Sequence, residues 1–287
     1  MNNRLKGTIW MCISALAMAL MGATVKVVGQ DISTFEKLFF RNLVGVVILL
    51  FTINKKNINI FGSSNKSRMF MIFRCTLGLI GAMLYFYSIN HLYLADSALL
   101  NKLSPFFVTF FATIFLKERL ERHQLPILFI VLFGALLVIK PKFSFEMIPA
   151  LAGFLSAIFA GGAYTLVRYL RTFEDPQTLV LWFSTFSAVG MIPLMLATGF
   201  IVPNTSQLIY LLLTGVFATI GQVALAYAYK FALASEVSVY QYLSIIFSAI
   251  IGFFSWGEVP DMLSLIGGSI IIGAAIFNYI LSQRKTI

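Results

Sequence analysis

Ten apolar segments, each close to the length that crosses a lipid bilayer, follow one another along this chain of 287 residues. The hydrocarbon core of a bilayer is about 30 Å thick, so a spanning helix needs roughly 20 apolar residues. Because lipid offers the backbone no hydrogen-bond partners, such segments must be helices. We therefore expect an all-α, polytopic membrane protein with ten transmembrane helices. The expected segments are 7–28, 33–53, 69–89, 92–116, 124–140, 147–170, 177–198, 207–230, 234–256 and 261–281.

The composition leaves little room for a soluble catalytic domain. Hydrophobic residues make up 59% of the sequence and charged residues only 11%, whereas a soluble domain carries about 25% charged residues. The sequence contains neither a P-loop nor a metalloprotease motif. Cys12 and Cys75 each lie alone inside a predicted helix, without His or Cys partners at metal-ligand spacing. The sequence therefore predicts no enzyme, no cofactor and no metal site.

The net charge of +10 follows the predicted loops of a membrane protein. If the N-terminus is cytoplasmic, the outer loops hold only Lys140 and Lys142, while the cytoplasmic segments hold most of the other Lys and Arg residues. An excess of these residues in cytoplasmic loops is the usual pattern. We therefore expect both termini in the cytoplasm and the lipid bilayer as the surrounding medium. No nucleic-acid partner is needed to explain the charge.

The two halves of the chain resemble each other when the sequence is shifted by 140 residues. The matching pairs include Gly81 with Gly221, Tyr87 with Tyr227, Leu103 with Leu243, Ser104 with Ser244 and Glu118 with Glu258. This division gives two repeats of five helices each, residues 1–142 and 143–287. Because five is odd, the second repeat enters the membrane upside down. Inverted repeats with a site near the bilayer midplane are a recurring plan of secondary transporters.

Several short motifs resemble those of the EamA-type carriers of the drug/metabolite transporter superfamily. They are Phe35-Glu36 with Phe39-Phe40-Arg41, Leu94-Ala95-Asp96, Leu103-Ser104-Pro105, Leu116-Lys117-Glu118, and Gly134. The resemblance covers nearly the whole chain. It implies ten helices, two EamA repeats, a bacterial inner-membrane location and transport of small metabolites. Ile245 stands where Pro105 would repeat, so the sequence does not predict the same bend in both halves.

Polar residues in the two central segments, 92–116 and 234–256, indicate a substrate cavity. Lys102 lies deepest among the charged residues, and it is the candidate partner of a substrate carboxylate or phosphate. Charged residues at this depth usually face a cavity or a partner. The candidate substrate-binding residues are Lys102, Asn101, Ser104, Gln241, Tyr242, Ser244, Gln222, Tyr85, Tyr164 and Trp10, with Pro105 as a candidate gating residue. The alternative is that these polar residues only bond helices together and that Pro105 is a static kink.

Four other charged residues are expected to be structural. Arg74 is expected to extend its side chain toward the cytoplasmic surface, as long cationic side chains near helix ends do. Arg41 is also assigned a structural role. Glu118 and Glu258 lie near helix ends, where capping or loop anchoring explains them.

We therefore predict a secondary-active carrier of a small polar metabolite, anionic or zwitterionic, that works by alternating access. Export of amino acids or related metabolites is the leading interpretation. Uptake of a nucleotide-like or vitamin-like metabolite is the alternative, because Tyr and Trp side chains could stack on its rings. A channel and a membrane lipid enzyme are disfavoured, since no selectivity-filter signature and no catalytic cluster are visible. The sequence leaves open whether the chain acts alone or as a homodimer.

Overall fold

The computed structural model describes residues 3–54, 60–116, 124–139, 147–170, 172–232 and 237–283. Within these residues the chain is all-helical, as the sequence predicts. The α-helices are α1 (Asn3–Val28), α2 (Thr34–Asn54), α3 (Asn65–His91), α4 (Leu94–Asn101), α5 (Ser104–Leu116), α6 (Gln124–Ile139), α7 (Ile148–Leu170), α8 (Pro176–Ala197), α9 (Thr205–Phe231), α11 (Leu243–Trp256) and α12 (Met262–Gln283), and a 3₁₀ helix, η2 (Ser238–Tyr242), precedes α11.

Most of these helices are long and apolar enough to cross a membrane. Eight helical stretches in the described part of the chain meet that criterion, and Pro126–Ile139 is a shorter apolar helix. The second helix, α2, has a similar length but carries Glu36, Lys37 and Arg41. The prediction of a polytopic helical membrane protein is therefore confirmed.

Two of the charged residues of α2 are buried and bonded within the protein. The Lys37 ammonium donates to the carbonyls of Val25 and Gly29 and to Asn90 Oδ1. A cation at the C-terminal end of α1 also interacts favourably with the negative end of that helix dipole. Glu36 Oε1 accepts the backbone N–H of Ile201 at 3.1 Å. These bonds explain how charges near one end of α2 are tolerated.

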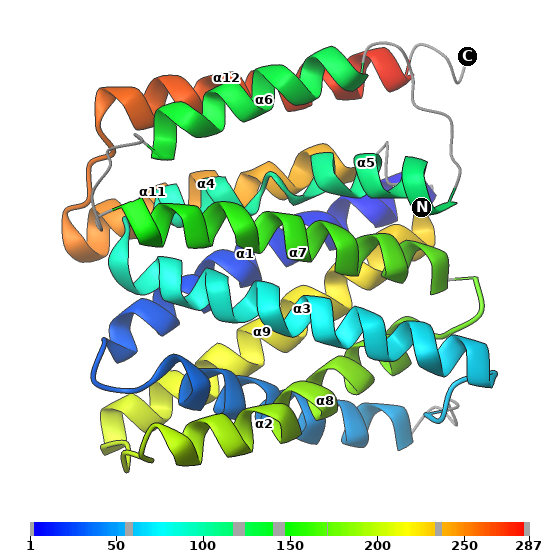
Figure 1. Cartoon of the computed structure of the whole chain (residues 1–287), viewed down its shortest axis with the longest axis vertical. Helices are drawn as coiled ribbons and strands as arrows, with labels where there is room; N and C mark the ends of the chain where they lie inside the picture. The colour runs from blue at the N-terminus through cyan, green and yellow to red at the C-terminus, as the bar shows by residue number, and fades with distance from the viewer. Residues whose placement is uncertain are drawn as a thin grey trace.

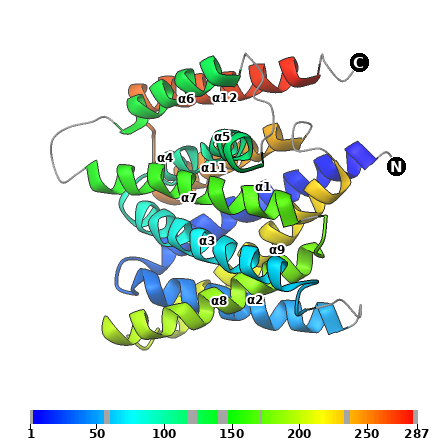
Figure 2. The same cartoon turned by 45° about the vertical axis from the view of Figure 1, so that its right-hand side comes forward.

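The helices pack as pairs from the two halves of the chain (Figures 1 and 2). Helix α1 lies along α9, α3 along α7, α2 along α8, α4 against α11, and α6 along α12. The α6–α12 pair forms one edge of the molecule. Its backbones approach closely at Gly134 and Gly267, because a Cβ atom on Gly267 would lie 2.5 Å from the Gly134 carbonyl oxygen. Small residues are the usual means of such close approach in membranes.

The predicted segment 92–116 is not one continuous helix. It divides into α4 and α5, with Lys102 as the cap of α4 and Ser104 as the first residue of α5. Pro105 therefore occupies the first turn of α5, where its missing N–H costs little. The break lies just before Pro105, so this residue begins a helix rather than kinking one.

A second irregularity lies 140 residues later, although no proline is present there. Residues Ser238–Tyr242 form the 3₁₀ helix η2, and α11 begins at Leu243. The predicted segment 234–256 is thus also divided, near the position equivalent to the break between α4 and α5. Both central segments depart from α-helical geometry at matching places, which the substitution of Ile245 for proline does not predict.

Both ends of the described chain lie at the same end of the helix bundle, called the termini end below (Figure 1). Arg4, near the start of α1, donates a hydrogen bond of 2.8 Å to the Tyr279 hydroxyl on α12. Glu258 lies at the opposite end, just beyond α11. Its predicted counterpart Glu118 falls outside the described residues.

Candidate functional site

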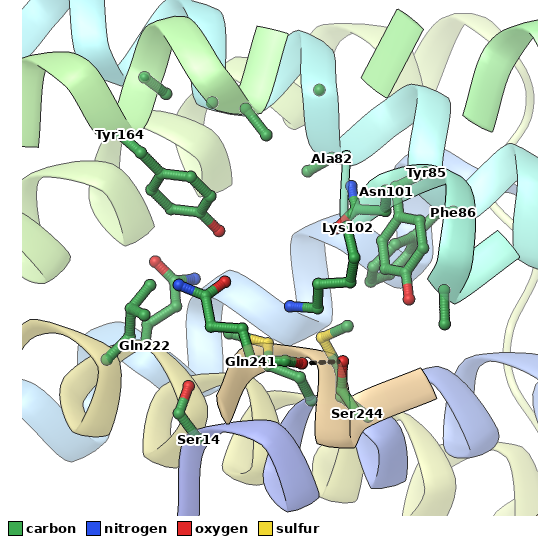
Figure 3. Close-up of a pocket in the computed structure, with 18 of the residues that line it drawn as sticks. Ser14, Ala82, Tyr85, Phe86, Asn101, Lys102, Tyr164, Gln222, Gln241 and Ser244 are labelled. Carbon is green, nitrogen blue, oxygen red and sulfur yellow. Dashed lines mark hydrogen bonds between the residues drawn. The ribbon is translucent and has the colours of Figure 1, made fainter. Parts of the chain in front are cut away.

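A cavity of about 90 Å³ lies among the central helices and collects most of the predicted site residues. It is lined by side chains from α1, α2, α3, α4, α7, α8, α9, η2 and α11. Among the predicted residues, the lining includes Lys102, Asn101, Gln241, Ser244, Gln222, Tyr85 and Tyr164. Figure 3 shows the side chains of Lys102 and Gln241 extending toward the same space.

Lys102 is positioned by the break between α4 and α5. It caps the C-terminus of α4, and its backbone N–H bonds to the Ala98 carbonyl at 3.0 Å. The negative end of a helix dipole favours a cation at this position. Within the described residues the Lys102 ammonium has no hydrogen-bond partner and faces the cavity (Figure 3). Its charge is therefore available to a ligand.

Arg74 and Arg41 also line this cavity, although neither is among the site residues predicted from the sequence. Arg74 is only 5% exposed and does not extend toward the surface. Its Nη2 donates to Gln222 Oε1 at 3.4 Å, and its guanidinium carbon lies 4.2 Å from the centre of the Phe183 ring. The Arg41 guanidinium carbon lies 5.6 Å from the same ring. The expectation that Arg74 reaches the surface is wrong, because neighbouring helices enclose it.

Several of the amides and hydroxyls at the cavity already bond helices together. Asn101 Nδ2 donates to Ser156 Oγ at 3.0 Å, and Gln241 Nε2 donates to the Tyr229 hydroxyl at 2.6 Å. Ser244 Oγ donates to the Gln241 carbonyl at 2.8 Å (Figure 3). These groups hold the cavity wall in shape, and their remaining lone pairs and protons can still reach a ligand.

Four predicted site residues, three substrate-binding candidates and the gating candidate, lie away from the cavity lining. Ser104 is buried, with 1% of its surface exposed, and does not line the cavity. Tyr242 packs in the apolar cluster shared by α4, α6, α7 and α12. Trp10 stacks on Tyr227 with ring centres 5.4 Å apart. Pro105 is also absent from the lining and lies in the first turn of α5.

The lining has a strongly positive character. It contains the cations Arg41, Arg74 and Lys102, and within the described chain it contains no Asp or Glu. In a poorly hydrated interior, charges of one sign attract a counter-ion more strongly than they do in water. The arrangement can therefore bind an anionic group. Sequence reasoning ranked Arg41 and Arg74 below Lys102 because depth along a helix does not show what the neighbouring helices enclose.

A second hollow, of about 600 Å³, lies between α3, α5 and α7. Its lining is almost wholly aromatic and aliphatic, with residues such as Phe73, Phe111 and Phe159. It offers few polar groups to fix the orientation of a polar metabolite, which binding sites normally provide. The smaller, charged cavity is therefore the better candidate for the functional site.

Comparison with known proteins gives one family and several relatives. The model of the EamA-like transporter family matches residues 5–140 and 147–280. The chain is 34% identical over 272 residues to the pseudopaline exporter CntI of Pseudomonas aeruginosa, covering 94% of each protein. It is 24% identical to the S-adenosylmethionine uptake transporter of Rickettsia bellii, covering 99% of this chain and 98% of that protein. It is 25% identical to the riboflavin transporter of Brucella anthropi, over 72% of this chain and 74% of that protein.

A solved crystal structure shares the fold. It covers 98% of both chains with a TM-score of 0.70 at 14% sequence identity. At this identity the similarity concerns the arrangement of the helices and carries no argument about the ligand.

Proposed function

This chain belongs to the EamA-like transporter family, and we propose that it is a secondary-active carrier of a small anionic or zwitterionic metabolite. It is a multi-pass membrane transporter, and its family and relatives are transporters rather than enzymes. We further propose that it works by alternating access and that its substrate binds in the cavity beside Lys102. The proposal also assigns the chain to the bacterial inner membrane.

The observation that carries the proposal is the cationic cavity at the break between α4 and α5. Lys102 presents an ammonium there with no partner among the described residues. A buried cation is costly unless it is paired or hydrated. A carboxylate or phosphate of the substrate supplies the missing partner, and Gln222, Gln241 and Tyr164 offer hydrogen bonds beside it.

The helix pairing supports two repeats related by approximate symmetry, which is a recurring plan of carriers that work by alternating access. In the proposed repeats, 1–142 and 143–287, α1 corresponds to α7, α2 to α8, α3 to α9, the segment of α4 and α5 to that of η2 and α11, and α6 to α12. If each element is replaced by its counterpart, the pairs α2–α8 and α6–α12 are unchanged, as is the contact between the two central segments, which α4 and α11 make. The same replacement turns the pair α1–α9 into α7–α3, which also exists. The family matches at 5–140 and 147–280 fall on either side of the proposed boundary.

The size of the cavity also favours a carrier that changes shape. Ligand pockets usually measure about 300–1,000 Å³, whereas this cavity is about 90 Å³. A metabolite can therefore bind only after the surrounding helices separate, as they do when one side of a carrier opens.

Export of amino acids or related metabolites is the favoured direction and class. The pseudopaline exporter matches this chain at 34% identity over 94% of each protein, which is closer than the uptake protein at 24%. Uptake of a nucleotide-like or vitamin-like metabolite is the second candidate. Tyr85, Tyr164 and Phe86 supply aromatic walls that could stack on a ring, and the riboflavin transporter is a relative.

The test begins with a thermal-shift screen of the purified protein against a metabolite library. A stabilising metabolite is then used for counterflow into proteoliposomes by wild type, by Lys102→Met and by Lys66→Met, which makes the same change at an exposed position. We expect saturable counterflow in wild type and Lys66→Met, with a marked loss in Lys102→Met. Flux that does not saturate would indicate a channel, and full counterflow in Lys102→Met would reject the proposed site.

A further inference from the structure

The guanidinium groups of Arg41 and Arg74 come from different helices, α2 and α3, and both lie near the Phe183 ring inside the protein. Both guanidinium carbons face the Phe183 ring, at 5.6 Å and 4.2 Å from its centre. Arg41 also lies 5.7 Å from the centre of the Phe86 ring. The exposed fractions of the two residues are 6% and 5%. Both charges are therefore held near one aromatic ring, out of bulk water.

These two groups keep unused hydrogen-bond donors. The Nε and Nη1 atoms of both arginines are buried and have no hydrogen-bond partner among the described residues. The aromatic rings provide cation–π attraction but cannot accept these bonds in the plane of the guanidinium. Leaving buried, charged donors unpaired is costly. If the arginines served only to hold helices together, carboxylates or carbonyls would be expected opposite these atoms.

We infer that Arg41 and Arg74 form a second anion site in the cavity, so that the transported metabolite carries at least two anionic groups. This inference rests on the proposed carrier function and makes its substrate class more specific. One anionic group lies at Lys102 and the other at the arginine pair. Guanidinium groups bind carboxylate or phosphate with two parallel hydrogen bonds, so either chemistry fits.

The electrostatics of the cavity agree with two anionic groups better than with one. Three cations share a lining that contains no Asp or Glu in the described chain. A single carboxylate would leave most of this positive charge unbalanced. Gln222, which accepts a bond from Arg74, also fixes that guanidinium in a defined orientation. The substrate class is therefore an acidic metabolite with two oxyanion groups.

The test uses two matched pairs of amino acids as probes. Glutamine and glutamate differ by one carboxylate, and serine and O-phosphoserine differ by one phosphate. The second carboxylate of glutamate is ionised at neutral pH, because its usual pKa is about 4.3. Affinities come from the rise of the unfolding midpoint with probe concentration at matched ionic strength. The proteins are wild type, Arg41→Gln, Arg74→Gln, Lys102→Met and the control Arg68→Gln, which removes an exposed arginine.

We expect wild type to bind one of the doubly anionic probes at least roughly tenfold more tightly than its matched partner, equal to about 1.4 kcal/mol. The affinity ratio, which is the affinity for the doubly anionic probe divided by that for its matched partner, is expected to fall toward one in Arg41→Gln and Arg74→Gln. It is expected to persist in Arg68→Gln. A preference for glutamate identifies carboxylate as the second group, and a preference for O-phosphoserine identifies phosphate. If Arg41→Gln does not give monodisperse protein, Arg41→Lys replaces it, because lysine keeps the charge without the planar fork.

Two results overturn the inference. One is a ratio near one in wild type for both pairs, and the other is a ratio that survives substitution of both arginines. Binding of glutamine that disappears in Lys102→Met, together with a wild-type ratio near one, rejects the second anion site and leaves the proposed carrier site standing. Absence of binding for all four probes counts against both.

Discussion

Lys26, in the last turn of α1, forms an ion pair with Glu258, which lies just beyond α11. The other carboxylate oxygen of Glu258 accepts the backbone N–H of Leu94 at 2.8 Å, at the start of α4. Lys26 also donates to the Leu92 carbonyl at 2.8 Å. One carboxylate thus connects α1, α4 and α11 at the end of the molecule opposite the termini, in keeping with the anchoring expected at a helix end.

The backbone around Glu258 is shaped by two glycines. Gly257 has a φ of +64° and ends α11, with its N–H bonded to the Phe253 carbonyl. A left-handed residue at this position is the usual C-terminal cap of a helix. A Cβ atom on Gly252 would lie 2.8 Å from Glu258 Oε2, so glycine there leaves room for the carboxylate.

Replacement of Glu258 by alanine is expected to destabilise the protein without abolishing transport by the folded molecules. The change leaves the Leu94 N–H without its acceptor and the Lys26 ammonium with only the Leu92 carbonyl. Leaving a buried donor unsatisfied costs about 1–3 kcal/mol. The measurement is the unfolding midpoint and abundance of Glu258→Ala, with transport normalised to monodisperse protein. Normal abundance combined with no transport would show that Glu258 acts in transport itself.

A carboxylate at the termini end is expected to stabilise the fold in a pH-dependent way. Glu174 Oε1 accepts bonds from the backbone N–H of Ser63 at 2.7 Å, from its hydroxyl at 2.6 Å, and from the Ser67 hydroxyl. Burial alone would raise the pKa of Glu174, but these hydrogen bonds outweigh it and hold the pKa below its ordinary value. A carboxylate whose pKa is lower in the folded than in the unfolded protein stabilises the fold at pH values above its ordinary pKa. This stabilisation is lost as the pH falls through the lowered pKa of the folded state.

We therefore expect Glu174→Gln to unfold at a lower temperature than wild type at neutral pH. The expected loss is about 1–3 kcal/mol, because the amide is a weaker acceptor for the same donors. The difference should shrink as the pH falls below about 4, where the wild-type carboxylate also becomes protonated. Thermal melts of both proteins across this range provide the measurement. A gap that stays constant with pH would show that the charge of Glu174 is unimportant.

Lys102 is expected to contribute to affinity rather than to folding. If Lys102→Met removes one member of a buried charge pair, affinity falls by about 2–5 kcal/mol, roughly 30-fold or more. Lys102→Arg should keep only part of the wild-type affinity, since the guanidinium is larger and planar. Substrate affinity on monodisperse variants gives the measurement. Wild-type affinity in Lys102→Met would remove this residue from the site.

The orientation in the membrane can be tested by labelling. The Lys and Arg distribution predicts that the connection between α8 and α9 lies outside the cell. Val202, which is 80% exposed in this connection, is replaced by Cys in a background with Cys12 and Cys75 changed to Ala. An impermeant reagent should label position 202 in intact cells and should label Lys66→Cys, at the termini end, only after permeabilisation. The reverse pattern would invert the predicted topology.

The hydropathy of the chain was sufficient to predict the helices because bilayer thickness imposes nearly the same length on each. The expected segment 177–198 corresponds to α8 at Pro176–Ala197, and 207–230 to α9 at Thr205–Phe231. In contrast, the break at Lys102 changes which residues share a face. Extrapolating a regular helix from Asn101 places Ser104 at the cavity, whereas the structure buries it elsewhere.

The arginines show a different limit of sequence reasoning. Arg74 lies well inside α3, and its distance from the helix end is compatible with a side chain that reaches the surface. Whether it does so depends on Phe183 of α8 and Gln222 of α9, which are distant in sequence and close in space. Periodicity within one helix contains no information about such neighbours.

The three cavity cations, Arg41, Arg74 and Lys102, all belong to the first region matched by the family, residues 5–140. The second region contributes uncharged polar groups such as Gln222 and Gln241. In the proposed alternating-access cycle, any movement of the first region relative to the second would carry this fixed positive charge with it. Each elementary charge moved through 100 mV corresponds to about 2.3 kcal/mol. A bound anion cancels part of this charge, so membrane voltage would act mainly on the return of the empty carrier and would set the turnover rate through that step.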